Sequence, residues 1–338
     1  MAALSVTNPT LLDLAQASDP SGKIGDIVEI LNQTNEILDD MSWQEGNLPT
    51  GHQLNMRTGI PVPTWRKMNG GVAPNKGTTS KITVNCGMLE AYAEIDAALA
   101  DLNGNTKAYR LIEDRAHIEG MNQEAASTLF YGNEGTEPEA FTGFSPIFNT
   151  SLAATSASGE NVIPGGGSGT DNASIWLVVW SPLTCFGVIP KGSQAGIKVT
   201  DKGQVTIEDV NGSNGGRMEA YRTHYRWDMG LCVRDWRYVV RIANIDKSTL
   251  TKDAATGADL PDLMFQAMRK IPTLSMGRPA FYASRDIATW IGRQTANLTK
   301  NSTLSSEMVG GKLVERFHGI PVRRVDALSA DEALVPAT

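Results

Sequence analysis

Residues 105–131, NTKAYRLIEDRAHIEGMNQEAASTLFY, carry the longest uninterrupted helical pattern of the chain. Asparagine and glycine residues flank this stretch on both sides and are typical start and stop signals. At about 1.5 Å per residue, a helix over the stretch would be roughly 40 Å long. Its apolar side chains recur three, four or seven residues apart and therefore share one helical face: Leu111, Ile118, Met121, Ala125 and Leu129. We expect this helix to be a spine across which the strands of a glycine-rich chain are laid.

The chain of 338 residues has a formal charge of -7, with 41% hydrophobic and 20% charged residues. This composition predicts a sizeable core, excludes a disordered protein and argues against a wholly basic nucleic-acid binder. Its 3 cysteines are widely spaced and form no CxxC pair, which argues against a disulfide framework or a structural zinc site. The sequence has no signal-peptide pattern and no apolar run of about 18 residues, so no membrane partner is expected.

Residues 1–45 are predicted to form an arm rather than the start of a globular core. Ser21 is suited to cap a helix in which acidic residues lie opposite an apolar stripe. The stripe includes Ile24, Ile27, Leu31 and Leu38. Short amphipathic helices bury little area against each other, so the stripe needs another surface. That surface is either the core of the same chain or a neighbouring subunit.

Residues 46–90 are predicted to form a long β-hairpin that projects from the body of the protein. The stretches HQLNMR and SKITVNC alternate apolar and polar residues as half-buried strands do. The connection between them contains three prolines, four glycines and an Asn-Gly tight-turn pair. An isolated ribbon is marginally stable in water, so something must lie under it. Trp65, with Arg66, Lys67 and Asn69 close by, is the expected contact; the alternative is an ordinary hairpin folded back on its own domain.

The rest of the chain mixes helices and strands without a regular βαβ order, which indicates an α+β class. Helices are expected at 89–102, 260–271 and 285–295, and strands at 175–180, 219–245, 278–284 and 315–328. Residues 151–171 are expected to be a flexible boundary, and residues 302–311 a polar loop.

No catalytic motif stands out. The glycine run at 165–169 lacks the strand-helix context of a nucleotide-binding loop or nucleophile elbow, and the four histidines lack metal-ligand spacing. The segment 217–241 interleaves six arginines with aromatic residues. A strand with aromatic residues inward and arginines outward explains this pattern, and the arginines are expected to pair with acids of a neighbouring subunit. A nucleic-acid surface is the alternative.

An arm, a long hairpin and a long helix, in this order, resemble the major capsid proteins of tailed bacteriophages with the Hong Kong 97-like fold. Three stretches support the resemblance: LFYGNEGTEPEAFTGF at 129–144, GRPAFYASRDIATWIGRQT at 277–295 and FHGIPVRRVDAL at 317–328. The first resembles the family's glycine-rich exit from the spine helix, the second its strand-then-helix element and the third its G-x-P-V strand. Because the long candidate strands precede the G-x-P-V strand, the order resembles the non-circularly permuted variant of short-tailed phages.

The resemblance implies an α+β capsid fold with an N-terminal arm, an extended hairpin loop, a spine helix, and peripheral and axial domains. Its limits here would be 1–45 for the arm, 46–90 for the hairpin loop, 91–171 and 216–250 for the peripheral domain with the spine helix at 105–131, and 172–215 and 251–338 for the axial domain. The arm is expected to run along a neighbour's spine helix. The expected subunit-interface residues are Ile24, Ile27, Leu31, Leu38, Trp65, Arg66, Lys67, Asn69, Glu113, Asp114 and Glu124.

The resemblance further implies a structural protein, not an enzyme, that self-assembles into an icosahedral shell around double-stranded phage DNA. Implied partners are other copies in hexamers and pentamers, a portal protein, a decoration protein and packaged DNA contacted without sequence specificity. A separate scaffolding protein is expected because the chain begins directly with the arm. No cofactor is expected, and the protein would belong to the virion after assembly in the cytoplasm of the bacterial host. The alternatives are an encapsulin-type nanocompartment shell and a hydrolase or binding protein of α+β fold.

Overall fold

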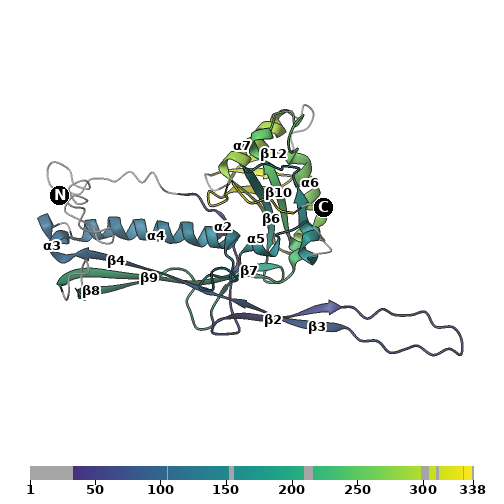
Figure 1. Ribbon diagram of the computed structural model, residues 1–338, viewed down its shortest axis with the longest axis horizontal. Coiled ribbons are helices and arrows are strands. Elements are labelled where there is room, and N and C mark those ends of the chain that lie inside the picture. The colour runs from purple at the N-terminus through teal and green to yellow at the C-terminus, as the bar shows by residue number, and fades with distance from the viewer. Residues whose placement is uncertain are drawn as a thin grey trace. The chain divides into compact units, whose positions relative to one another are not determined.

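The computed structural model describes residues 33–104, 106–151, 156–208, 216–297, 304–309, 312–329 and 331–336. The chain divides into two compact units, which we describe separately (Figure 1). The first unit comprises Met1–Asn35, Met88–Ser127 and Gln194–Asp228, and the second comprises Glu36–Gly87, Thr128–Ser193 and Met229–Thr338. The long helix and the longest strand have residues in both.

The first unit packs a helix on a small antiparallel sheet. Its elements are β4 (Gly87–Asp96), α3 (Ala97–Ala100), η1 (Leu102–Gly104), α4 (Thr106–Tyr131), β8 (Lys198–Glu208) and β9 (Arg217–Val233). Strand β9 lies between β8 and β4, and its pairing with β8 runs from Arg226 opposite Lys198 to Arg217 opposite Glu208. Tyr109 of α4 is buried with Ile95 of β4 and packs against Tyr221 of β9, so α4 lies on this sheet.

The second unit contains the other elements. They are α2 (Ile37–Asp40), β1 (Trp43–Glu45), β2 (Gly51–Gly59), β3 (Thr78–Asn85), α5 (Phe144–Ile147), η2 (Ala157–Asn161), β5 (Val162–Pro164), β6 (Asn172–Trp180), β7 (Cys185–Ile189), η4 (Trp236–Tyr238), β10 (Val239–Asp246), η5 (Lys247–Thr249), α6 (Leu260–Lys270), η6 (Leu274–Met276), β11 (Arg278–Ala283), α7 (Arg285–Asn297), β12 (Leu304–Val309), β13 (Lys312–Phe317) and β14 (Ile320–Arg324).

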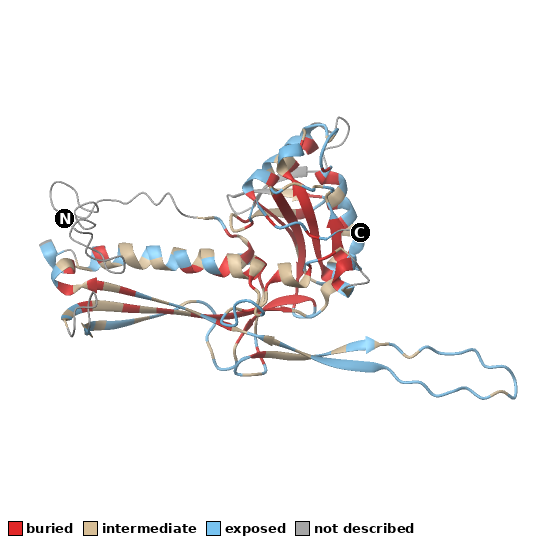
Figure 2. Ribbon diagram, in the orientation of Figure 1, coloured by how far each residue is buried: buried red, intermediate tan, exposed pale blue. Residues whose placement is uncertain are grey.

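Strand β6 is the centre of the second unit. It pairs antiparallel with β10 and β11, and all nine of its residues are buried, as the red strands of Figure 2 show. One face of β6, with Leu177 and Val179, joins the core that α6 and α7 cover. On the other face, Trp176 packs against the rings of Phe130, at the end of α4, and Phe144, in α5. The unit is therefore a sheet with apolar cover on both faces.

The predicted hairpin is present. Strands β2 and β3 pair antiparallel from Gly51 opposite Asn85 to Gly59 opposite Thr78, and residues 60–77 connect them (Figure 1). Half-buried and exposed residues alternate over residues 54–57 of β2 and 81–85 of β3, as the sequence pattern predicted, but not over the rest of either strand. The α+β class is confirmed, and so are the strand at 175–180, the helices at 260–271 and 285–295, the strands at 219–245 and 278–284, and the closing strand pair.

The single apolar face predicted for the long helix is only partly correct. Met121, Ala125 and Leu129 are buried, but Leu111 is 52% exposed and Ile118 is 38% exposed. Near the start of α4 the buried side chain is Tyr109, which packs with Ile95 and Tyr221, and not Leu111. The face that α4 buries there is therefore not the face that the apolar periodicity predicted.

Two predicted elements are wrong. Residues 89–102 were expected to be an acidic helix, but they belong mostly to strand β4, followed by the short helix α3. Alternate residues such as Ala93 and Ile95 are buried, so pairing in the sheet overrides the helical propensity of alanine, leucine and glutamate. Residues 302–311 were expected to be a polar loop, but β12 pairs with β13 from Leu304 opposite Phe317 to Val309 opposite Lys312. The sequence has Gly-Gly between these strands, a hairpin signal that the polar composition obscured.

Candidate interaction surfaces

The connection at the end of the β2–β3 hairpin is the most exposed apolar segment of the described chain. The exposed fractions of its large apolar residues are Ile60 80%, Val62 71%, Trp65 104%, Met68 95% and Val72 51%. Figure 2 shows the segment in pale blue along almost its whole length. Isolated apolar side chains on a surface are ordinary, but a concentration of them on one protruding segment marks an interaction site.

The hairpin tip nevertheless has a defined backbone. Asn69 has a positive φ of 60°, and the amide of Gly70 donates to the carbonyl of Lys67 over 3.1 Å, which closes the predicted tight turn. The Asn75 side chain donates to the carbonyl of Val62 across the connection. Turn and cross-strand bond therefore hold the backbone in place while the Trp65 side chain extends into solvent.

The hairpin is also uniformly basic. Between Gly51 and Met88 the sequence has no acidic residue and five basic ones: Arg57, Arg66, Lys67, Lys76 and Lys81. Residues 88–127 of the first unit have the opposite balance, with eight acidic and three basic residues. The two stretches of sequence therefore have opposite charge balances, and within the second stretch Glu90 and Glu94 pair with Arg226 and Arg222 of the same chain.

The expected interface acids on α4 interact within the subunit. Asp114 accepts a hydrogen bond from the hydroxyl of Tyr225 in β9. Burial and this carboxylate raise the pKa of Tyr225 well above its usual value. Glu113 and Glu124 also interact within the chain, and Glu124 is exposed. Their contact with a neighbouring subunit stays a prediction. The residues of the arm, Ile24, Ile27 and Leu31, lie outside the described residues.

The expectation that the arginines of 217–241 pair with a neighbouring subunit is wrong for those that form ion pairs within the chain. Arg222 lies 2.6 Å from Glu94, and Arg226 lies 2.8 Å from Asp228. The adjacent strands β4 and β9 place Glu94 beside Arg222, a long-range pairing that the segment alone does not reveal, whereas Asp228 lies two residues from Arg226 in the same strand. Three further pairs are Arg217–Glu208, Arg237–Asp235 and Arg241–Glu332.

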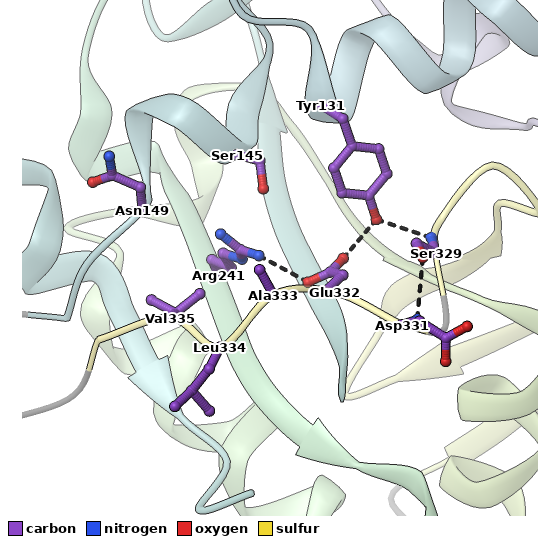
Figure 3. A pocket seen from close by; sticks show the side chains of 10 residues that line it. All are labelled: Tyr131, Ser145, Asn149, Arg241, Ser329, Asp331, Glu332, Ala333, Leu334 and Val335. Carbon is purple, nitrogen blue, oxygen red and sulfur yellow. Dashed lines mark hydrogen bonds and ion pairs between the residues drawn. The ribbon is translucent and has the colours of Figure 1, made fainter. Parts of the chain in front are cut away.

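Arg241 is the centre of a buried polar network that fixes the C-terminal strap, residues 331–336, to the sheet (Figure 3). Its guanidinium lies 2.8 Å from a Glu332 carboxylate oxygen, and both side chains are 4% exposed. The other Glu332 oxygen accepts from the Tyr131 hydroxyl over 2.6 Å, and Arg241 also donates to the carbonyl of Phe148 over 2.9 Å. The Ser174 hydroxyl donates to Glu332, so the buried charges are well compensated.

The strap is held by its backbone as well. The Asn244 side chain donates to the carbonyl of Val335 over 2.8 Å and accepts from the amide of Val335 over 2.9 Å. The amide of Glu332 donates to the carbonyl of Asn172 in β6 over 2.9 Å. No local pattern reveals this network, because Arg241 and Glu332 are separated by 91 residues.

A cavity of about 470 Å³ lies beside this network, and its lining includes Tyr131, Ser145, Asn149, Arg241 and Glu332 (Figure 3). Burial and the Glu332 carboxylate raise the pKa of Tyr131 well above its usual value. Tyr131, Arg241 and Glu332 bond to one another or to the backbone, so the arrangement stabilises the fold. Within the described residues, no group of three or more His, Cys, Asp or Glu side chains is placed to hold a metal ion. No helix in the described ranges has the length and hydropathy of a membrane span.

Comparison with known proteins identifies a family. A family model described as major capsid protein GP7 matches residues 19–336. The solved structure of bacteriophage Epsilon15 contains a chain with 37% sequence identity and a TM-score of 0.78, over 99% of this chain and 100% of that chain. No curated protein sequence matches the chain.

Two further solved structures are more distant. The capsid of bacteriophage JBD30 matches with 11% identity and a TM-score of 0.46, over 87% of this chain and 91% of that chain. The SrpI encapsulin complex from Synechococcus elongatus PCC 7942 matches with 10% identity and a TM-score of 0.39, over 66% of this chain and 93% of that chain. At these TM-scores the two structures are too dissimilar to support a conclusion about this chain.

Proposed function

The chain belongs to the family of major capsid proteins described as GP7, and on that premise we propose that copies of it close into an icosahedral shell around double-stranded phage DNA. It is a structural capsid protein with the Hong Kong 97-like fold. The observation that supports this most is the match at 37% identity over the whole of a bacteriophage chain. We propose that assembly is its whole activity, without catalysis and without a cofactor.

For the shell contacts, we propose that the β2–β3 hairpin lies on a neighbouring copy. Trp65 supplies the apolar anchor, and Arg66 and Lys67, at the start of the tight turn that contains Asn69, supply positive charge. The acidic balance of residues 88–127, which include Glu113, Asp114 and Glu124, makes that part of the neighbour the complementary surface. An aromatic anchor beside charged residues is the usual composition of an interface hot spot.

For the arm, we propose that Ile24, Ile27 and Leu31 are covered by a spine helix in the assembled shell. Leu38, in α2, is half-buried within its own unit and would be the boundary between the arm and the body. The arm would then end near residue 45, and the limits expected from the sequence for the hairpin loop and for the peripheral and axial domains are retained as proposals.

The partners follow from the role as a shell protein. We propose hexamers and pentamers of this chain, a separate scaffolding protein and a portal protein during assembly in the host cytoplasm, and a decoration protein on the finished virion. We propose that contact with packaged DNA is non-specific. The arginines of β9 that form ion pairs within the chain, such as Arg222 and Arg226, leave little of that strand for base recognition.

Electron microscopy of the expressed chain, with and without a candidate scaffolding protein, tests the proposed function. The expected result is closed particles of uniform diameter. Protein that stays monomeric at high concentration under both conditions would contradict the shell. Particles that enclose a protein cargo, and that form without a scaffold, would favour a nanocompartment shell instead.

A further inference from the structure

The glycine run at 165–169 folds against the end of strand β10. Backbone hydrogen bonds join the run to this strand, and the amide of Gly167 donates to the carbonyl of Asn244 over 2.8 Å. The chain then enters β6 at Asn172, which lies opposite Asp246 in the ladder between β6 and β10. The glycine run, the end of β10 and the start of β6 therefore meet at one place in the second unit.

Two carboxylates converge on this place. The amide of Ser248 donates to an oxygen of Asp171 and to an oxygen of Asp246, each over 3.0 Å, so the two acids share one N–H. Their other oxygens face Gly169, where an added Cβ would lie 2.8 Å from Asp246 Oδ2 and 3.1 Å from Asp171 Oδ1. A side chain larger than glycine would therefore fill the space that these two oxygens border.

No basic side chain of the described residues forms an ion pair with Asp171 or Asp246. Lys247 is adjacent in sequence, but its Nζ lies 3.9 Å from Oδ2 of Asp286. Asp246 is only 9% exposed. Two neighbouring negative charges are unfavourable, and charges that are buried in proteins are paired or coordinate a metal ion. The charges at this place therefore favour the binding of a cation.

A third oxygen beside the two carboxylates has no partner. Asn172 is fully buried, and its Oδ1 accepts no hydrogen bond from the part of the chain that the structure describes. Nδ2 of the same carboxamide donates to the carbonyl of Gly169 over 2.6 Å, which fixes its orientation. Opposite residues of an antiparallel ladder have their side chains on the same face, so the Asn172 carboxamide lies between Gly169 and Asp246. This observation does not depend on charge, and it indicates a ligand at the same place.

We propose that Asp171, Asp246 and Oδ1 of Asn172 bind a divalent cation, of which Ca²⁺ fits best. Ligands that are all oxygen select a hard cation, and Ca²⁺ accepts about six to eight carboxylate, amide and water oxygens in a flexible arrangement. The site has only two acids, with an amide oxygen beside them, and water completes the coordination. The ion is structural, because it ties the glycine run to both strands.

Calorimetric titration of calcium chloride into full-length subunits, stripped of metal with a chelator, tests the site. One ion per chain is expected, with a Kd of roughly 10⁻⁴–10⁻³ M, the weak end of the range for protein calcium sites. Asp171→Asn and Asp246→Asn should each weaken binding by about ten-fold or more, because affinity follows the charge of the ligands. Asp286→Asn is the matched control, because Asp286 is exposed and contacts the adjacent Lys247. Equal affinity in wild type and in both site variants, or an equal loss in the control, would overturn the proposal.

Thermal unfolding separates loss of the ion from loss of the fold. In chelator, Asp171→Asn is expected to melt at a higher temperature than wild type, because it removes the repulsion between the two carboxylates. In millimolar calcium, the melting temperature of wild type should rise by about 2–4 °C and that of the variant should not change. A wild type that calcium does not stabilise, or a variant that gains as much, would overturn the proposal.

Magnesium is the competing ion. Mg²⁺ demands a near-ideal octahedral geometry and loses its water reluctantly, so it should bind at least about ten-fold more weakly than Ca²⁺. Equal affinity for the two ions would overturn the assignment to calcium, and no binding of either ion up to about 10 mM would overturn the site. These measurements use subunits, so their outcome does not depend on whether the protein closes into a shell.

Discussion

Strand β6 and the β2–β3 hairpin belong to the same unit, yet β6 buries its apolar residues and the hairpin exposes them. All nine residues of β6 are buried, with Trp176 fully buried between the sheet and the rings of α4 and α5. The hairpin ends in Trp65, which is fully exposed. Both regions have ordered backbones and similar side chains, so the difference lies in what covers them.

This contrast separates residues that stabilise the subunit from residues that serve its contacts. The sheet is complete in one chain, and even its buried charges, Arg241 and Glu332, are paired there. The hairpin lacks such cover, and its basic charge has its complement on another part of the chain. We therefore expect changes in the sheet to alter unfolding, and changes in the hairpin to alter assembly without altering unfolding.

The largest effect is expected in the buried network. Arg241→Ala leaves Glu332 buried without its main partner, and we expect the free energy of unfolding to fall by roughly 3–5 kcal/mol. Arg237→Ala is the matched control, because Arg237 is 56% exposed and pairs with Asp235 on the surface. Its loss should be below about 1 kcal/mol. Chemical denaturation of subunits measures the free energy of unfolding of both variants. Equal losses would contradict the claim that the buried ion pair matters more than the surface pair.

Trp65→Ala is the corresponding change in the hairpin. We expect it to weaken association by about 2 kcal/mol or more, because exposed aromatic anchors dominate interface energies. Its unfolding free energy should stay within about 0.5 kcal/mol of wild type. Sedimentation gives the concentration needed for assembly. The Trp65→Phe variant should keep most of the association free energy of wild type. A Trp65→Ala subunit that unfolds more easily but assembles normally would reverse the assignment.

Alkaline pH should lower the stability of the subunit, because it ionises a tyrosine of the buried network. Burial raises the pKa of Tyr131 above its unfolded value, so the unfolded chain releases this proton first as pH rises. Stability is therefore complete below about pH 10 and falls above it, by at most about 1.4 kcal/mol per pH unit for one group. Tyr131→Phe should lose stability less steeply between pH 10 and 11 in denaturation experiments. An unchanged slope would mean that Tyr131 is not linked to unfolding.

The smallest effect is expected from the charges of the hairpin. Replacing Arg66, Lys67 and Lys76 with serine should weaken assembly by about 0.2–1 kcal/mol per residue and reduce its dependence on salt. Light scattering across a salt series measures this dependence. If the variant shows the same salt dependence as wild type, the acidic surface of residues 88–127 does not receive the hairpin.

Local patterns predicted the elements that have one kind of neighbour along their length. The alternation of β2 and β3, the apolar run of β6 and the amphipathic helix α6 were all recognised for this reason. Patterns failed where tertiary pairing decides the structure. Strand β4 is made of good helix formers but pairs in a sheet, and α4 buries Tyr109 near its start where the apolar periodicity predicted Leu111.

The candidate interaction residues follow the same rule: those with a local sequence signal were predicted, and those that depend on long-range contacts were not. Trp65 was singled out from a turn signal and a ribbon that needs support; it is fully exposed, and its role as a contact residue stays a prediction. The pairing of Arg222 with Glu94 and of Arg241 with Glu332 was not recognised, because each pair joins residues about a hundred positions apart. Such contacts can be recognised only once the three-dimensional structure is known.

Oxidative footprinting of Trp65 in isolated subunits and in assembled shells tests the central claim most directly. Trp176, which is fully buried, provides an internal reference that should react slowly in both states. We predict that oxidation of Trp65, read by mass spectrometry, is fast in the subunit and severalfold slower in the shell. Equal rates at Trp65 in both states would contradict the claim that the hairpin is exposed in the subunit in order to be covered in the shell.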